Sequence, residues 1–353
     1  MDKIAKLRDQ FASLGIDGML ITSAQNRRYF TGFTGTAGVV LISATESRLV
    51  TDYRYADQAK QQAAGYEVVK HTGNIFAETA AQAKSMGINR LGFEQEHLTF
   101  GHYRKYDEQV KAELVPTSGV IEGFRMFKSA EEQAAIRTAA QIADAAFAHI
   151  CGYIRPGITE LDVANELEMF MRKQGATSSA FDTIVASGYR SALPHGVASS
   201  KEIASGEMVT LDFGAYYKGY RSDMTRTVAV GEPGEELRRV YAIVLESLTQ
   251  ALAGMKPGVT AKEADAFMRD VIVRHGYEEL SGSGTGHGIG LDIHEEPFFS
   301  VAGTKLLAPG MIVTVEPGIY LPGLGGVRIE DDILIIEGGN EVLTHSPKEL
   351  ILL

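Results

Sequence analysis

Apolar residues recur at helical spacing in the first stretch of the chain. Ile4, Leu7, Phe11 and Leu14 lie three or four positions apart among charged residues. This spacing predicts an amphipathic helix that packs on a core. We therefore expect a packed helix here rather than a signal peptide.

Strand patterns and another helix follow within the first 125 residues. The strand patterns are GMLIT at 18–22, GVVLIS at 38–43 and RLVTDYRY at 48–55. Apolar spacing over residues 75–86 predicts a helix. This alternation predicts an α/β domain over residues 1–125.

A turn-rich segment, PTSGVIEGFRMFKSAEE at 116–132, closes this domain. Ser129 and Glu132 in it have the spacing of a capping box, which starts a new helix. Five apolar residues at helical spacing come next: Ile136, Ala140, Ala143, Phe147 and Ile150. We therefore expect two domains, 1–125 and 126–353.

The second part of the chain contains an internal repeat. RPGIT at 155–159 reappears as KPGVT at 256–260, 101 residues later, and both precede apolar residues at helical spacing. TLDFGAY at 210–216 has its counterpart in TVEPGIY at 314–320, 104 residues later. Two matches in the same order, one on helices and one on strands, favour a duplicated α+β unit.

Acidic residues occupy apolar strand patterns in this repeat. Asp212 lies between Leu211 and Phe213, where strand periodicity places a buried side chain. Its counterpart in the second copy is Glu316. A buried carboxylate must be neutralised, hydrogen-bonded or facing a cation. Taken alone, Asp212 fits a satisfied buried acid as well as a metal ligand.

Each copy supplies a second acid, Asp223 in the first and Glu330 in the second, and GTGHGIGLDIHEEP with His287 and His294 lies between them. Four carboxylates in one cleft repel one another strongly unless they are compensated. Two divalent cations would compensate them. Oxygen ligands with a single imidazole suit an ion such as Mn²⁺ and argue against a structural zinc site. Two metals that bridge a water favour hydrolysis of a carbonyl or phosphoryl group.

Composition narrows the class of protein. Hydrophobic content of 44% and charged content of 22% are typical of a globular protein. Residues 1–125 hold 15 Lys+Arg against 14 Asp+Glu, which leaves 19 against 31 in residues 126–353, a net charge of −12. This acidity argues against nucleic-acid binding. With a single cysteine, Cys151, and no apolar run of membrane-spanning length, we expect a cytoplasmic protein without disulfides or membrane contact.

Five residues follow one another in a fixed order: Asp212, Asp223, His287, Glu316 and Glu330. With PHG at 194–196 and GVRIEDD at 326–332, this order resembles the pita-bread metallopeptidases, which include methionine aminopeptidase, aminopeptidase P and prolidase. NRRYFTGFTGTAG at 26–38 and TDYRY at 51–55 are similar to the N-terminal domain of the proline-specific members. The resemblance covers essentially the whole chain. It implies an α+β fold with a duplicated pita-bread catalytic domain after a smaller α/β creatinase/prolidase-like domain.

The resemblance implies a dinuclear metallo-exopeptidase that cleaves the bond between an N-terminal residue and proline, as an Xaa-Pro dipeptidase or aminopeptidase. In such a site Asp212 and Asp223 chelate one metal, His287 binds the other, and Glu316 and Glu330 help to hold both. Manganese is the expected ion, with cobalt or zinc as alternatives. The resemblance also implies a homodimer that acts on small peptides with proline in second position.

Catalytic roles follow from the same resemblance. Glu316 would accept a proton from the bridging water and pass it to the leaving proline nitrogen. His195 and His294 would contact the scissile carbonyl, and Arg328 would orient substrate and the acidic cluster. Many relatives carry a histidine where this chain has Ser283. That departure leaves a secondary substrate contact open.

Other interpretations exist for single residues and for the whole site. His195 and His294 also fit surface or hydrogen-bonded histidines, and Arg328 fits an exposed ion pair with Glu330 worth under about 1 kcal/mol. The same two metals also suit a phosphoester or organophosphate hydrolase. A non-catalytic binding member or a metal-free hydrolase of creatinase type would have replaced ligands, whereas all five are present here. The choice between dipeptides and longer peptides, and the native metal, stay open.

Overall fold

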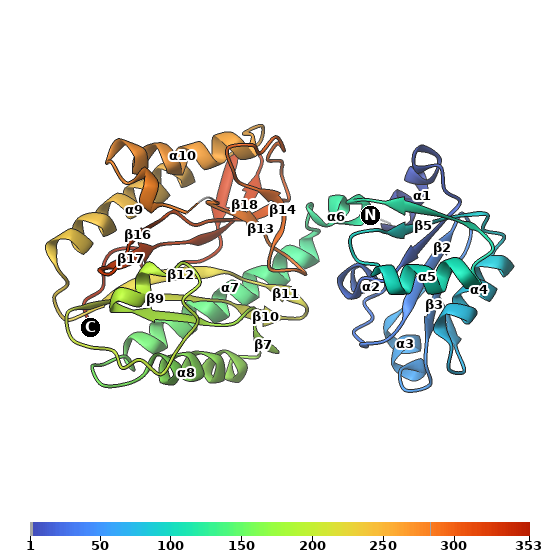
Figure 1. Ribbon diagram of the computed structural model, residues 1–353, viewed down its shortest axis with the longest axis horizontal. Helices are drawn as coiled ribbons and strands as arrows, with labels where there is room; N and C mark the ends of the chain where they lie inside the picture. Colours follow the sequence, from blue (N-terminus) through green and yellow to red (C-terminus); the bar gives the residue numbers. More distant parts are fainter. Residues whose placement is uncertain (1–2, 283) are drawn as a thin grey trace. The chain divides into compact units, whose positions relative to one another are not determined.

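The chain folds into two compact units, Met1–Arg125 and Met126–Leu353. The computed structural model describes residues 3–282 and 284–353. The strands of each unit pair only within that unit (Figure 1). Each unit also has its own apolar core.

The first unit is built on a six-stranded mixed sheet in the order β4-β3-β2-β1-β5-β6. Its strands are β1 Gly18–Ile21, β2 Val39–Ser43, β3 Ser47–Thr51, β4 Glu67–Lys70, β5 Arg90–Glu94 and β6 Glu113–Thr117. Its helices are α1 Lys3–Leu14, α2 Ala24–Thr31, α3 Ala56–Gln62, α4 Ile75–Ser85, α5 Phe100–Gln109 and α6 Val120–Arg125. Strands β1, β5 and β6 pair in parallel, whereas β1, β2 and β3 pair antiparallel. The unit is therefore α/β, as the sequence predicts.

The predicted helices of this unit are present. Helix α1 buries Leu7 and Phe11, which lie on its apolar side. Helix α4 begins after Asn74, whose side chain accepts hydrogen bonds from the backbone N–H groups of Phe76 and Ala77. This cap satisfies donors that have no partner within the helix.

The third predicted strand is shorter than expected. Strand β3 ends at Thr51, and the prediction that it continues to Tyr55 is wrong. The carboxylate of Asp52 accepts hydrogen bonds from the backbone and the side chain of Arg54. Asp bonded to its own backbone two residues on forms a turn, and this turn ends the strand.

The second unit has four long helices: α7 Ala130–Cys151, α8 Glu160–Lys173, α9 Glu235–Gly254 and α10 Ala261–Arg274. Two sheets, β12-β9-β8 and β14-β13-β15-β18-β19, form its centre, with smaller sheets β11-β10-β7 and β16-β17 beside them. The strands of the first copy are β7 Ser178–Ser179, β8 Ile184–Ser187, β9 Glu207–Phe213, β10 Ala215–Tyr217, β11 Tyr220–Arg221 and β12 Met224–Val230. Those of the second copy are β13 His287–Gly288, β14 Glu295–Phe298, β15 Ile312–Val315, β16 Gly318–Leu321, β17 Gly325–Arg328, β18 Asp331–Ile336 and β19 Gly339–Val342. Two 3-10 helices span Gly188–Ala192 and Glu278–Leu280.

The repeat predicted from the sequence is a structural duplication. Helices α8 and α10 both have 14 residues, and both start with a capping box, at Thr159 and at Thr260. The loop before each helix makes the same backbone bond, from Gly157 to Ile203 and from Gly258 to Leu307, both 2.9 Å long. The antiparallel pairs β9–β12 and β15–β18 also correspond. The predicted capping box of α7 is present as well.

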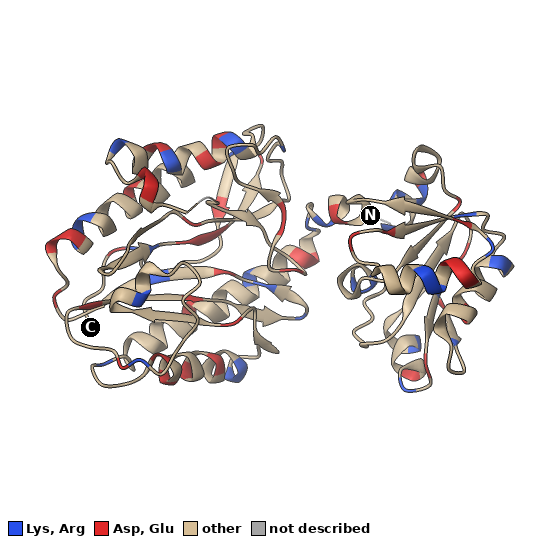
Figure 2. Cartoon of the chain, in the orientation of Figure 1, with Lys and Arg blue, Asp and Glu red and all other residues tan. Residues whose placement is uncertain are grey.

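The helices cover the sheets from two sides (Figure 1). Helices α7 and α8 pack on β8, β9 and β12, and α9 and α10 pack on β15, β17 and β18. Figure 2 shows that acidic residues lie on the central strands of this unit as well as on its outer helices. Among the described residues, no helix is both long and apolar enough to cross a membrane.

Candidate metal centre

The acidic residues singled out in the sequence lie at equivalent ends of the duplicated strand pairs. Asp212 is in β9 and Asp223 directly precedes β12. Glu316 directly follows β15, and Glu330 directly precedes β18. Each copy therefore presents one acid from its first strand and one from the start of its second strand to a common cavity.

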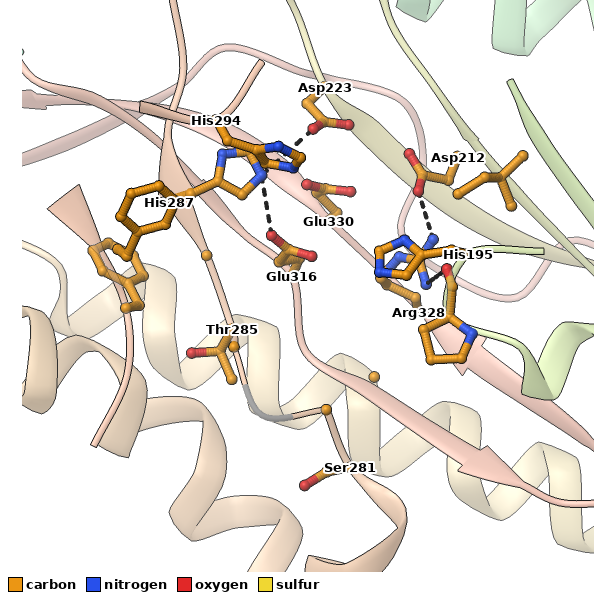
Figure 3. Close-up of a pocket in the computed structure, with 18 of the residues that line it drawn as sticks. His195, Asp212, Asp223, Ser281, Thr285, His287, His294, Glu316, Arg328 and Glu330 are labelled. Carbon is orange, nitrogen blue, oxygen red and sulfur yellow. Dashed lines mark hydrogen bonds and ion pairs between the residues drawn. The ribbon is translucent and has the colours of Figure 1, made fainter. Parts of the chain in front are cut away.

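Three of the five residues come closest together. One ligand atom each of Asp223, His287 and Glu330 lies within 4.8 Å of the others, and all three residues are buried. His287 Nε2 is 3.7 Å from Oδ2 of Asp223 and 3.4 Å from Oε1 of Glu316 (Figure 3). His287 Nδ1 lies 3.0 Å from the backbone oxygen of Gly288. This contact suits a ring that carries its proton on Nδ1 and turns the lone pair of Nε2 towards the acids.

Asp212 occupies the other side of the cluster (Figure 3). Its Oδ2 accepts a hydrogen bond of 2.6 Å from Nη2 of Arg328. Among the described residues, the buried Oδ1 atoms of Asp212 and Asp223 have no hydrogen-bond partner. Because a buried polar atom without a partner is costly, these oxygens indicate a place for a ligand.

Burial and mutual repulsion raise the pKa of the acids in the cluster. Burial raises the pKa of Asp223 well above its usual range, and the charge of Glu330 raises it further. The pKa of Glu330 is raised well above its usual range by burial and then by Glu316. Burial also raises the pKa of Glu316. A bound cation would stabilise the ionised form of these acids most strongly, because it offsets both their burial and their mutual repulsion.

The donor set fits divalent cations. Four carboxylates and one imidazole make an oxygen-rich site with a single borderline nitrogen ligand, which suits manganese and related ions. The buried oxygens without partners and the raised pKa values are the features that such ions would compensate. The site does not have the thiolates of a structural zinc site.

Arg328 is a buried part of this site. Its side chain is 4% exposed. Beyond Asp212 it donates to the hydroxyl groups of Tyr320, 2.8 Å away, and Thr225, 3.1 Å away, and to the backbone oxygen of Pro194. The alternative of an exposed ion pair with Glu330 is therefore wrong. Burial opposes the charge of Arg328, but Tyr320 and Asp212 raise its pKa well above the usual value.

Two threonines that the sequence analysis missed hold the acids in place. Thr225 Oγ1 donates to Oε2 of Glu330 over 2.6 Å. Thr314 Oγ1 accepts from the backbone N–H of His287 and lies 3.1 Å from Oε1 of Glu316. Thr314 begins the TVEPGIY copy of the repeat, so the recurrence of threonine two residues before the acid was an available signal.

Asp332 is a further buried acid that the sequence analysis did not single out. Its Oδ2 accepts the backbone N–H of Asp223 over 2.9 Å. Burial raises the pKa of Asp332 well above its usual range. Its place in GVRIEDD, two residues after Glu330, was the only sequence signal.

A cavity of about 760 Å³ opens on the acids and on both predicted histidines. The ring of His294 packs edge-on against that of His287 at 4.5 Å between centroids. Burial lowers the pKa of His294, and the neighbouring His287 lowers it further. His195 lines the same cavity beside Arg328 (Figure 3). Apolar side chains complete the wall: Phe181, Ile184, Ile293, Phe298 and Phe299.

Ser283, where many relatives carry a histidine, lies outside the described residues.

In the first unit, ligand atoms of Glu94, His97 and Glu122 also come within 4.8 Å of one another. The Glu94 carboxylate is already bonded to the backbone and hydroxyl of Thr22 and to the amide of Asn26, so it needs no cation.

Comparisons with known proteins agree with this geometry. A model of metallopeptidase family M24 matches residues 134–337, and a model of the creatinase/prolidase N-terminal domain matches residues 3–127. The chain therefore belongs to metallopeptidase family M24. It combines the pita-bread catalytic fold with the additional N-terminal domain, as the sequence predicts.

Three of the proteins that this chain resembles are enzymes named for the Xaa-Pro bond. The solved Xaa-Pro dipeptidase from Bacillus anthracis is 58% identical, with a TM-score of 0.99 over 100% of this chain and 99% of its own. The Xaa-Pro dipeptidase of Pyrococcus horikoshii is 39% identical over 99% of both chains. The solved X-Pro aminopeptidase from Thermotoga maritima MSB8 is also 39% identical, with a TM-score of 0.91 over 98% of this chain and 100% of its own.

Proposed function

We propose that this chain hydrolyses the peptide bond between an N-terminal residue and proline, with two divalent ions held by its acidic cluster. The observation that carries the proposal is the buried cluster of Asp223, His287 and Glu330, which opens with His195 and His294 on one cavity. Relatives with the same fold are named as Xaa-Pro dipeptidases or aminopeptidases. Manganese is our proposed ion, with cobalt or zinc as alternatives.

We assign five residues as ligands. Asp212 and Asp223 would hold one ion, His287 the other, and Glu316 and Glu330 both. Bound divalent ions supply Lewis acidity towards the scissile carbonyl and lower the pKa of a water. Further support comes from the unpartnered carboxylate oxygens among the described residues.

The remaining residues of the cavity would handle protons and charge. Glu316 would accept the proton of the attacking water and deliver it to the proline nitrogen, a role that suits a carboxyl whose pKa burial has raised. His195 and His294 would donate to the carbonyl oxygen as negative charge develops on it. Arg328 would keep Asp212 in place through its 2.6 Å contact.

Proline makes this arrangement useful. An Xaa-Pro amide has no N–H, so a peptidase cannot rely on a hydrogen bond from that nitrogen. Recognition then rests on the free amino group, the carbonyl oxygen and the shape of the pyrrolidine ring. The apolar wall that includes Phe298 and Phe299 offers a surface for such a ring.

The test is a panel of peptides with added Mn²⁺. We expect Ala-Pro or Met-Pro to be cleaved at least ten times faster than Ala-Ala, a preference that needs about 1.4 kcal/mol of transition-state binding. If Ala-Ala is cleaved as fast as Ala-Pro, the proposal of proline specificity is wrong, and the chain is a broader aminopeptidase. A phosphotriester in the same panel tests the phosphoester-hydrolase alternative, and Ala-Pro-Ala tests the preference for dipeptides.

We further propose a cytoplasmic homodimer that acts on small peptides and not on nucleic acid. The net charge of −11 disfavours a polyanion. The single cysteine, Cys151, is compatible with a reducing compartment. Light scattering at micromolar concentration tests the dimer, and a mass equal to the 38.2 kDa of one chain would refute it.

A further inference from the structure

Arg226 lies behind the metal centre, where the two copies of the duplicated unit cross. It belongs to β12, three residues after Asp223, and is 1% exposed. Its Nη1 donates to the backbone oxygens of Thr225 and Glu330. The backbone N–H of Glu330 in turn donates to the oxygen of Thr225 over 3.0 Å. One guanidinium thus joins the strand of one copy to a predicted metal ligand of the other.

The same guanidinium also binds residues 344–353, which we call the tail segment. Its Nη2 donates to Oδ1 of Asp331 over 2.8 Å and to the backbone oxygen of Ser346 over 2.9 Å. Its Nε donates to the backbone oxygen of Pro347 over 3.0 Å. All of its nitrogens therefore have acceptors. These contacts tie the tail segment to Asp331, the residue that follows Glu330.

Asp331 is fully buried and binds the tail segment directly. Its Oδ1 accepts from the hydroxyl of Thr344 over 2.8 Å, and its Oδ2 lies 3.1 Å from Nζ of Lys348. Thr344 Oγ1 also accepts the backbone N–H of Asp332, whose carboxylate accepts the backbone N–H of Asp223. A continuous series of hydrogen bonds therefore runs from the tail segment to both Asp223 and Glu330.

The tail segment is itself anchored to the first copy. The backbone N–H of Ala229 in β12 donates to the oxygen of Ile351 over 2.9 Å, and the N–H of Leu353 donates to the oxygen of Ala229 over 2.8 Å. The hydroxyl of Tyr241 in α9 also donates to the backbone oxygen of Lys348 over 2.7 Å. The C-terminal end lies beside the sheet that contains β9 and β12 (Figure 1). The M24 family model ends at residue 337, before this segment begins.

We propose that Arg226 is a positioning residue that, together with the tail segment, sets the spacing of the metal ligands and hence the affinity for divalent ions. The predicted ligands come from both copies. The hydrogen bonds of Arg226 hold the backbone of β12 next to that of Glu330, so they also fix the distance between Asp223 and Glu330. Groups that orient ligands without touching the metal change metal affinity by about 10- to 100-fold in other proteins.

Arginine is needed here for geometric reasons. Its planar group presents five N–H donors in a fixed fork, whereas the lysine ammonium has three donors at one point. Lysine at position 226 would keep the positive charge next to Asp331. Its ammonium group could not reach all of the acceptors that Arg226 now binds, so some of them would be left without a donor. Arg226→Lys therefore changes the position of the ligand strands while it keeps the net charge.

The test is a titration of the metal-free protein with Co²⁺, followed by visible absorption, which reports on ligand number and geometry. Arg226→Lys should bind Co²⁺ at least ten times more weakly and with an altered spectrum. Thr344→Val, which keeps Arg226 and removes one hydroxyl, should bind at least three times more weakly. The matched control is Leu248→Ala, which creates a cavity in the buried apolar face of α9.

Each outcome decides the proposal. If Leu248→Ala lowers the melting temperature but keeps the wild-type cobalt affinity and spectrum, the losses in the other variants come from the centre and not from general destabilisation. Wild-type affinity and spectrum in Thr344→Val and in Arg226→Lys would overturn the proposal, and Thr344→Val decides alone if Arg226→Lys does not fold. Equal losses in Leu248→Ala would also overturn it. Because no peptide is used, a failure of proline specificity leaves this result unaffected.

Discussion

The guanidinium of Arg328 lies 2.6 Å from the carboxylate of Asp212, across 116 residues of sequence and between the two copies of the catalytic unit. Both side chains are buried, at 4% and 11% exposure. The pair leaves one Asp212 oxygen without a hydrogen-bond partner among the described residues. One cation of the protein thus offsets part of the negative charge of the cluster, and the proposed metal ions would offset the rest.

Removal of Arg328 should therefore destabilise the metal-free protein. Arg328→Met leaves Asp212 buried without its cation, and we expect the free energy of unfolding to fall by about 3 kcal/mol. Denaturant unfolding in a chelator measures this change. Arg137→Met is the control, because its ion pair with Glu341 is partly exposed and should contribute under about 1 kcal/mol. If the free energy of unfolding falls equally in the two variants, the contact with Asp212 contributes no more to stability than an exposed ion pair does.

Asp223→Asn should separate metal binding from folding. Burial and the charge of Glu330 raise the pKa of Asp223, so its charge is unfavourable in the metal-free fold. We expect the metal-free variant to melt at a higher temperature than the metal-free wild type, to bind fewer than two ions, and to lose at least 100-fold in kcat/KM. Elemental analysis and thermal unfolding measure this, with exposed Glu337→Gln as the control. A fully active variant with two ions would remove Asp223 from the ligand set.

Metal affinity should rise with pH over an unusually high range. Ligands bind metal in their deprotonated form, and burial raises the pKa of Asp223, Glu316 and Glu330 above their ordinary values. Protons therefore compete with metal at a higher pH than they would at ordinary carboxylates. We expect Mn²⁺ affinity and peptidase rate to fall steadily from pH 8 to pH 5, measured by titration at each pH. A flat profile over this range would contradict the assignment.

His195 and His294 should affect the rate without affecting the metal. They line the cavity, but neither belongs to the buried cluster of Asp223, His287 and Glu330. His195→Ala and His294→Ala should keep two ions per chain while kcat falls by about 10²- to 10³-fold, because a donor to the developing charge is lost. Loss of metal from either variant would make that histidine a ligand instead.

The capping boxes of α8 and α10 offer a test of the duplication. Thr159→Ala and Thr260→Ala each remove an equivalent cap from a helix of 14 residues, and each should cost about 1 kcal/mol. The two boxes share no hydrogen-bond partner, so the double variant should cost the sum of the two. Thermal unfolding measures the three values, and activity at low temperature should stay at the wild-type level.

The sequence contained enough information to predict the duplicated fold. Strand periodicity predicted the burial of Asp212, and the match of TLDFGAY with TVEPGIY aligned it with Glu316. Local capping signals predicted that α7 begins directly after Ser129. Each of these features is a short local pattern or the recurrence of such a pattern, so it can be read without knowledge of the tertiary structure.

Contacts between the copies could not be predicted in the same way. Arg328 is two residues from Glu330 in sequence, which left a local ion pair open as an alternative, yet its guanidinium contacts Asp212 in the other copy. The contacts of Arg226 with Ser346 and Pro347 depend on the path of the tail segment, which has no periodic pattern.

The division of the acids between the two copies has a consequence for biosynthesis. Asp212 and Asp223 are translated about a hundred residues before Glu316 and Glu330. A nascent chain that has folded only its first copy holds half of the acidic cluster and lacks His287. Such a chain does not contain the complete proposed metal centre, so it could not hydrolyse other newly made peptides. With the proposed ligand set, hydrolytic capacity would arise only after the second copy has been synthesised and docked on the first, so the arrangement of the repeat would itself delay the onset of activity.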